Sequence, residues 1–167
     1  METLHFITGS TGAGKTTYAR RLADEIGAVR FSIDEWMAAL FWMDAPQPMD
    51  SAWAMARIER CRERIWQVAL DIVARDTPVL LELGFTTRAV RQAFAARAAA
   101  AGVPVRLHLL DVPAAERWRR VEARNARLAE EGQLDFPIDR TMFDYVEAMW
   151  EAPDDVELAA LNGVRAT

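Results

Sequence analysis

The sequence predicts a single α/β domain built on a parallel β-sheet with helices packed on it. Short apolar runs typical of strands alternate with segments whose apolar residues recur at helical spacing, and this alternation is typical of parallel sheets with right-handed crossovers. Residues 9–16 also match the phosphate-loop pattern Gly-x-x-x-x-Gly-Lys-[Ser/Thr]. A length of 167 residues suits one domain with a substantial core, so we expect residues 1–167 to form one P-loop domain.

The first strand is expected at Leu4–Thr8 and the first helix at Thr16–Ile26. Apolar residues of this helix fall on one face, and Gly27 follows as a glycine C-cap. Strand, glycine-rich loop and helix thus come in the order that a phosphate site needs, because the loop must bring a helix N-terminus to the phosphate.

The loop residues predict a nucleotide site. Lys15 is the single lysine among 20 basic residues, and its compact ammonium suits β- and γ-phosphate oxygens in a tight backbone cradle better than a planar guanidinium does. The glycines let backbone N–H groups turn toward phosphate, and the Thr16 hydroxyl is a ligand for Mg²⁺. The residues expected to hold the nucleotide are Gly9, Gly12, Ala13, Gly14, Lys15, Thr16 and Thr17.

A second strand is expected at Val29–Ile33, followed directly by Asp34. The stretch at about 36–54 lacks a regular period, contains two prolines and is crowded with aromatic residues, which predicts a loop-rich cap inserted beside the substrate. A long helix from about Met55 to Arg75 comes next, and Cys61 lies at its core spacing.

The rest of the chain continues the alternation of strands and helices. An unbroken apolar run at Val79–Leu83 suits a parallel strand that is covered on both faces. The later elements are a helix from Thr86 or Thr87 to Gly102, a strand at Val105–Leu110, a helix opened by Pro113, a helix at about Asp139–Trp150 and a weak fifth strand near Gly163–Ala166.

Ligands of such sheets bind at the carboxyl ends of the strands, so polar residues there are candidates for the site. Asp34 follows the second strand and is the candidate base for a substrate hydroxyl; the alternative is that it caps the next helix. Glu82 is near the end of the third strand and is a candidate Mg²⁺ ligand acting through water; the alternative is a buried glutamate paired with an arginine.

An arginine stripe supplies candidate cations for the transferred phosphate. It consists of Arg117, Arg120, Arg124 and Arg127, which share one helix face within a segment at about 117–136. A lid that closes over phosphates has this pattern, and so does a solvated helix face with acidic neighbours.

Two further groups are candidates for binding the substrate. Arg88 and Arg91 lie one turn apart after the third strand, where they either grip substrate or form an ordinary surface pair. Trp36 and Phe41 belong to the aromatic cluster of the cap and either line a substrate pocket or pack in the core.

Composition narrows the classes of function. A net charge of −5 and a pI near 5.1 oppose general binding to nucleic acid, and no apolar run approaches the roughly 18 residues of a membrane span. One cysteine and no export leader fit a cytoplasmic protein, which we expect to be a monomer or homodimer. With no lysine left for an Asn-Lys-x-Asp motif, GTP-binding switches are excluded.

Several motifs spread over nearly the whole chain share an order and spacing. They are the phosphate loop, Ser32–Glu35, Leu81–Phe85, Leu110–Pro113, Arg120–Asn125 and Trp150–Pro153. In this order they resemble the zeta-toxin and chloramphenicol-phosphotransferase-like group of bacterial P-loop kinases, which are often classed as AAA-family ATPases. The resemblance implies a five-stranded, nucleotide-kinase-like P-loop fold with a small lid, ATP with Mg²⁺, and phosphorylation of a hydroxyl on a small molecule.

The resemblance also assigns residues. It puts Asp34 at the position of the family's base, and Arg120 and Arg124 at the positions of its lid arginines. This chain departs from the family in two places: Glu82 stands where many relatives have Asp, and the C-terminal motif reads Trp-Glu-Ala-Pro instead of Phe-Glu-Pro-Pro.

The sequence therefore predicts an ATP-dependent phosphotransferase whose acceptor is an antibiotic, a nucleotide sugar or a nucleoside. Its catalytic residues would be Lys15, Asp34, Arg120 and Arg124. Two rival hypotheses are a nucleotide-dependent switch without a small-molecule acceptor and a polynucleotide 5′-hydroxyl kinase, which would use the arginine stripe to bind a strand.

Overall fold

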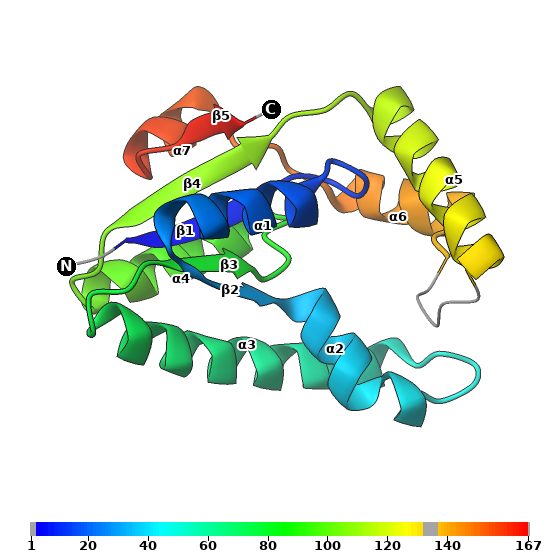
Figure 1. The fold of residues 1–167 in the computed structure, drawn as a ribbon, viewed down its shortest axis with the longest axis horizontal. Coiled ribbons are helices and arrows are strands. Elements are labelled where there is room, and N and C mark those ends of the chain that lie inside the picture. The colour runs from blue at the N-terminus through cyan, green and yellow to red at the C-terminus, as the bar shows by residue number, and fades with distance from the viewer. Residues whose placement is uncertain (1–2, 132–136, 167) are drawn as a thin grey trace.

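The computed structural model describes residues 3–131 and 137–166, which fold around one five-stranded sheet (Figure 1). Every strand pair is parallel, and the strand order is β2-β3-β1-β4-β5. The strands are β1 (Leu4–Thr8), β2 (Val29–Ser32), β3 (Val79–Glu82), β4 (Val105–Leu110) and β5 (Val164–Ala166). The predicted parallel sheet is confirmed, including its weak fifth strand.

Helices cover the two faces of the sheet. They are α1 (Lys15–Ile26), α2 (Ile33–Phe41), the 3-10 turn η1 (Trp42–Asp44), α3 (Ser51–Val73), α4 (Arg88–Ala100), α5 (Ala114–Glu131), α6 (Arg140–Met149) and α7 (Asp155–Ala160). None of them, within the described part of the chain, is both long and apolar enough to span a bilayer.

The period of two along each strand divides the core into two layers. Leu4 and Phe6 of β1 pack into the larger cluster, together with side chains of α3 and α4. Ile7 points to the opposite face and joins a smaller cluster with Ala19 of α1. The long apolar run of β3 follows from this arrangement, because its side chains enter both clusters.

The region after β2 is more helical than the sequence predicted. The second strand ends at Ser32, whose hydroxyl accepts a hydrogen bond from the Glu35 backbone N–H at 3.4 Å and caps α2. Helix α2, η1 and the start of α3 occupy most of the expected loop-rich cap at 36–54, so the prediction of a loop-rich segment was wrong, while its role as a cap stays a prediction. Both prolines lie in the short connection at 45–50, where they break no helix.

Two other predictions need comment. Helix α7 was not predicted; it has only six residues, and Asp154 caps it by accepting from the Glu157 N–H at 2.7 Å. The predicted lid at about 117–136 corresponds to α5 as far as residue 131, and its last part, 132–136, lies outside the described residues.

We expect Leu107→Ala to lower the free energy of unfolding by about 3 kcal/mol, because it leaves a cavity in the larger core cluster. Leu107 is 0% exposed. Urea denaturation followed by circular dichroism measures the change. The matched control, Val156→Ala on α7, removes a side chain that is 74% exposed, and it should change stability by less than about 0.5 kcal/mol. Equal effects of the two substitutions would contradict the assigned core.

Candidate functional site

The phosphate loop joins β1 to α1 and wraps around the Lys15 side chain. Lys15 Nζ donates hydrogen bonds to the carbonyl oxygens of Gly9 at 2.8 Å and Ser10 at 3.2 Å. The loop depends on a left-handed backbone at Gly12 and Gly14, with φ of 79° and 90°. At Gly12 a Cβ would also lie only 2.5 Å from the Arg117 carbonyl oxygen, so no other residue fits there.

The surroundings of Lys15 shift the pKa of its ammonium group. Removal from water lowers the pKa of its ammonium below the ordinary value, and the nearby carboxylates of Asp34 and Glu82 oppose this shift. A phosphate group at the loop would further stabilise the charged form. Lys15 therefore stays the candidate cation for an anion at this loop.

Thr16 and Glu82 form the candidate metal site at the carboxyl ends of the strands. The Thr16 hydroxyl donates to Glu82 Oε2 at 3.2 Å, while Arg30 Nη1 donates to Glu82 Oε1 at 2.5 Å. Of the two alternatives that the sequence left open for Glu82, the structure shows the pairing with an arginine. Its other oxygen lies next to the Thr16 hydroxyl, and the role of Glu82 as a Mg²⁺ ligand stays a prediction. Burial raises the pKa of Glu82, and its contacts with Arg30 and Thr16 oppose that rise.

This pair of oxygen donors fits Mg²⁺. The ion prefers oxygen ligands and keeps several waters and substrate phosphates in its shell, so it needs few protein ligands. Among residues 3–131 and 137–166, no group of three or more His, Cys, Asp or Glu side chains forms a dedicated metal cage. Thr16 and Glu82 are thus the residues that would hold Mg²⁺ next to a phosphate chain.

Asp34 lies in the first turn of α2, with an exposed carboxylate. Ser32 is the N-cap of this helix, so the structure does not use Asp34 as the cap. Asp34 instead lines a cavity of about 650 Å³ together with Lys15 and the loop. The other residues lining this cavity are Thr11, Gly12, Ala13, Gly14, Thr16, Thr17, Tyr18, Arg21, Leu110, Arg120, Val121, Arg124, Arg127 and Ile138.

The arginine stripe of α5 separates into two parts. Arg120, Arg124 and Arg127 line the cavity opposite the loop, and Arg120 Nη1 donates to the Ala13 carbonyl oxygen at 3.4 Å. Arg117 is buried: its guanidinium donates to the Thr11 carbonyl oxygen at 3.2 Å and to both Glu147 carboxylate oxygens at 2.7 and 2.8 Å. Arg117 therefore holds the loop in place, while the other three face the ligand space.

Sequence reasoning missed Glu147. This residue of α6 accepts a hydrogen bond from the Ser10 hydroxyl at 2.9 Å as well as the two from Arg117. It ties the phosphate loop to α5 and α6. No local signal could have found it, because Ser10 and Glu147 are 137 positions apart in the chain.

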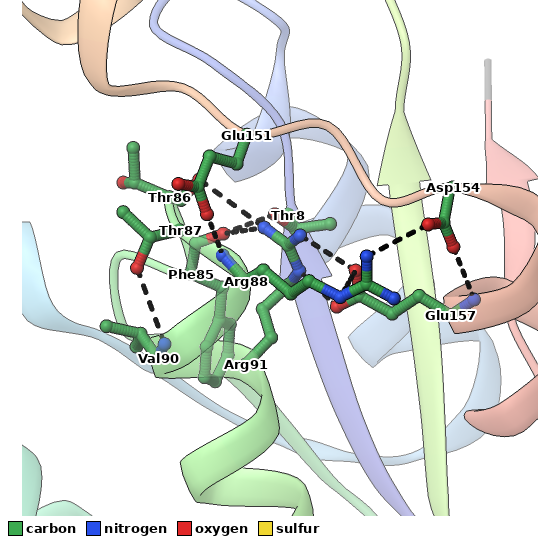
Figure 2. A network of polar contacts seen from close by, with 10 residues as sticks. All are labelled: Thr8, Phe85, Thr86, Thr87, Arg88, Val90, Arg91, Glu151, Asp154 and Glu157. Carbon is green, nitrogen blue, oxygen red and sulfur yellow. Dashed lines mark hydrogen bonds and ion pairs between the residues drawn. The ribbon is translucent and has the colours of Figure 1, made fainter.

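Arg88 and Arg91 do not line the nucleotide cavity. Figure 2 shows them in a network between α4 and the C-terminal segment. Arg91 is 0% exposed and forms a bidentate ion pair with Glu157 at 2.6 and 2.9 Å. Arg88 Nη1 donates to Asp154 at 3.0 Å, and its backbone N–H donates to Glu151 at 2.7 Å. We therefore correct the expected substrate role of Arg91 to a structural one, since its donors are already used.

The aromatic candidates lie on the cap, outside the same cavity. Trp36 packs edge-to-face on Phe31, with ring centroids 6.0 Å apart. The Arg57 guanidinium lies over the Trp53 ring at 3.8 Å and over the Phe41 ring at 5.7 Å. Both Trp36 and Phe41 also pack on the larger core cluster, so much of their surface serves the fold.

A glycine-rich loop that encloses a lysine, at the carboxyl edge of a five-stranded parallel sheet, defines a P-loop nucleotide-binding domain with a kinase-like fold. The family model described as an AAA domain, AAA_33, matches residues 4–141, and the chain belongs to this family. No curated protein matches the sequence.

Solved structures of low sequence identity share the fold. Kti12 from Chaetomium thermophilum, solved with ADP-AlF3, has a TM-score of 0.68 and 16% identity over 98% of this chain and 88% of that chain. A putative kinase from Chloroflexus aurantiacus J-10-fl has a TM-score of 0.64 and 16% identity over 92% and 82%. A sugar kinase from Janibacter sp. HTCC2649 has a TM-score of 0.56 and 18% identity over 99% and 84%.

We expect Glu157→Gln to destabilise the protein by about 3 kcal/mol or more, because it leaves the buried Arg91 charge without its counter-charge. Thermal unfolding monitored by calorimetry measures the loss. The control is Asp155→Asn on the same short helix, whose partner Arg165 is exposed; it should cost less than about 1 kcal/mol. Similar losses for the two variants would contradict the structural role of Arg91.

Proposed function

We propose that this protein is an ATP-dependent phosphotransferase that moves the γ-phosphate to a hydroxyl of a small molecule. The observation that carries the proposal is that one cavity is lined by both Lys15 and Asp34, a phosphate-binding cation and an exposed carboxylate. Phosphoryl transfer requires both groups. The cation helps to bind the leaving phosphates, and the carboxylate accepts the proton of the attacking hydroxyl.

The roles of the residues follow from their positions. Lys15 and the loop N–H groups bind the β- and γ-phosphates, and Asp34 takes the proton of the attacking hydroxyl. Arg120 and Arg124, which approach from α5, neutralise the charge that builds up on the transferred group. Because α5 also carries Arg117, the same helix that supplies these cations is fixed to the loop backbone.

Thr16 and Glu82 would hold Mg²⁺ in this scheme. A magnesium ion held there would supply positive charge that lowers the repulsion between the phosphates and an incoming oxygen. The rest of the proposed reaction depends on the positions of Lys15, Asp34 and the α5 arginines.

Family resemblance supports the same class of reaction. By the resemblance to the zeta-toxin and chloramphenicol-phosphotransferase-like kinases, Asp34 stands where that family has its base, and two of the structural relatives are described as a putative kinase and a sugar kinase. The acidic net charge weighs against the polynucleotide kinase alternative. A nucleotide-dependent switch would bind ATP and leave every acceptor unphosphorylated, so product analysis separates it from the proposed enzyme.

The decisive experiment is incubation with γ-labelled ATP and a panel of antibiotics, nucleosides and nucleotide sugars. Mass spectrometry then looks for an added phosphate. A product that forms with wild-type protein and is absent with Lys15→Ala supports the proposal. ATP binding with no phosphorylated product in any pool would favour the switch.

We expect Asp34→Asn to lower the rate of phosphoryl transfer at least about a hundredfold, because the amide cannot take the proton. ATP affinity, measured by calorimetry, should stay within about threefold, since Asp34 is not placed as a phosphate ligand. Asp44→Asn, which removes an exposed carboxylate that does not line the cavity, is the control and should keep most of the activity. Full activity of Asp34→Asn would refute the assigned base.

Lys15→Ala should raise the barrier to transfer by about 3 kcal/mol or more, because the lost cation stabilises charge that develops on the phosphates. Steady-state kinetics with saturating ATP measures the change in kcat. Lys15→Arg should not restore the rate, since the larger guanidinium does not fit the space bounded by the Gly9 and Ser10 carbonyls. Recovery of activity by arginine would contradict the shape argument.

A further inference from the structure

A chain of hydrogen bonds crosses the core away from the phosphate loop. Tyr18 Oη of α1 and His108 Nδ1 of β4 are 2.7 Å apart. His108 Nε2 and His5 Nδ1 of β1 are 2.9 Å apart. Both imidazoles are buried, so these contacts are the main means of satisfying their polar atoms.

The two ends of this Tyr18–His108–His5 chain reach different cavities. Tyr18 lines the nucleotide cavity with Lys15 and Asp34. His5 lines a second cavity of about 240 Å³, at the amino ends of β1 and β4. The other residues of this second cavity are Thr3, Pro104, Val105, Arg106 and Asn162. His5 Nδ1 is hydrogen-bonded to His108. The other ring nitrogen of His5, Nε2, is therefore the one that can contact a molecule in the second cavity.

The hydrogen bonds of the Tyr18–His108–His5 chain can point in only two directions. Burial is the main cause that lowers the pKa of each histidine to about 4, with Arg106 adding to the effect, so both rings are neutral near pH 7. A neutral imidazole has one N–H donor and one acceptor nitrogen. Therefore the nitrogen that carries the proton in one ring determines which nitrogen carries it in the other ring. The protonated nitrogen of His108 in turn sets the direction of the Tyr18 hydroxyl.

In the first arrangement, His5 Nε2–H points to the second cavity. His108 Nε2–H then donates to His5 Nδ1, and the Tyr18 O–H donates to His108 Nδ1. In the second arrangement each donor becomes an acceptor: His5 Nδ1–H donates to His108 Nε2, and His108 Nδ1–H donates to the Tyr18 oxygen. The Tyr18 proton is then available to the nucleotide cavity.

The lining of the second cavity suits a small anion. Thr3 and Arg106 supply hydrogen-bond donors, and none of the six lining residues carries a carboxylate. Arg106 is the one permanent cation among them, which matches a single negative charge. A carboxylate is the common biological monoanion with this chemistry.

We propose that the second cavity binds a small carboxylate and that the Tyr18–His108–His5 chain couples it to the nucleotide cavity. The carboxylate accepts from His5 Nε2–H and so selects the first arrangement, which turns the Tyr18 proton toward His108. A nucleotide atom that accepts from Tyr18 selects the second. The two ligands therefore weaken each other's binding, and by linkage the factor is the same in both directions.

The test uses the full chain labelled with ¹⁵N-histidine, with acetate as the probe. The sequence has two histidines, so imidazole nitrogen shifts report directly on the tautomers of His5 and His108. Acetate should shift the His5 signals saturably toward the Nε2–H form. Arg106→Gln should weaken this binding at least about fivefold, and Arg60→Gln, an exposed arginine on α3, should leave it unchanged. Unsaturable shifts, or equal affinity in Arg106→Gln, would overturn the site.

A second titration tests the coupling. A saturating, non-hydrolysable ATP analogue should weaken acetate binding by about fivefold in wild-type protein. Tyr18→Phe should still bind acetate but lose the effect of the nucleotide, because the chain no longer reaches the nucleotide cavity. An unchanged acetate affinity with nucleotide, or a full effect in Tyr18→Phe, would disprove the coupling. No step measures phosphoryl transfer, so failure here is distinct from failure of the proposed enzyme.

Discussion

The backbone of the phosphate loop is the constraint on which the rest of the site depends. Gly12 has a left-handed conformation and no room for a Cβ against the carbonyl oxygen of Arg117. The loop therefore contacts α5 directly, backbone against backbone. This close approach brings the arginines of α5 to the phosphate side of the sheet, opposite Asp34, and it sets the width of the cavity between them.

Buried ion pairs between distant segments stabilise this arrangement. Glu147 joins the loop to α5 and α6 through Ser10 and Arg117. Arg91 and Glu157 join α4 to α7 in the same way. Both members of the Arg91–Glu157 pair are buried, so each charge needs its partner, whereas in the Arg117–Glu147 pair only the arginine is buried. The segment after α5, through Glu147 and Glu157, thus supports a fold whose candidate site groups lie mostly in the first 34 residues and in α5.

The features that the sequence predicted are those that depend on local spacing. The phosphate-loop pattern placed Lys15 and Thr16 correctly at the start of α1, and short apolar runs located the strands. The helices of the cap were not predicted because aromatic residues and two prolines obscure a helical period there. The one local signal for a helix start is the N-cap Ser32. The ion pairs of Arg91 and Glu147 could not be predicted, since they depend on residues 66 and 30 positions away.

The cations that face the cavity are already coordinated in this structure. Lys15 contacts the carbonyl oxygens of Gly9 and Ser10, and Arg120 contacts that of Ala13. A phosphate that binds these cations would exchange neutral carbonyl oxygens for anionic ones, so only the difference between the two kinds of hydrogen bond would add to its affinity.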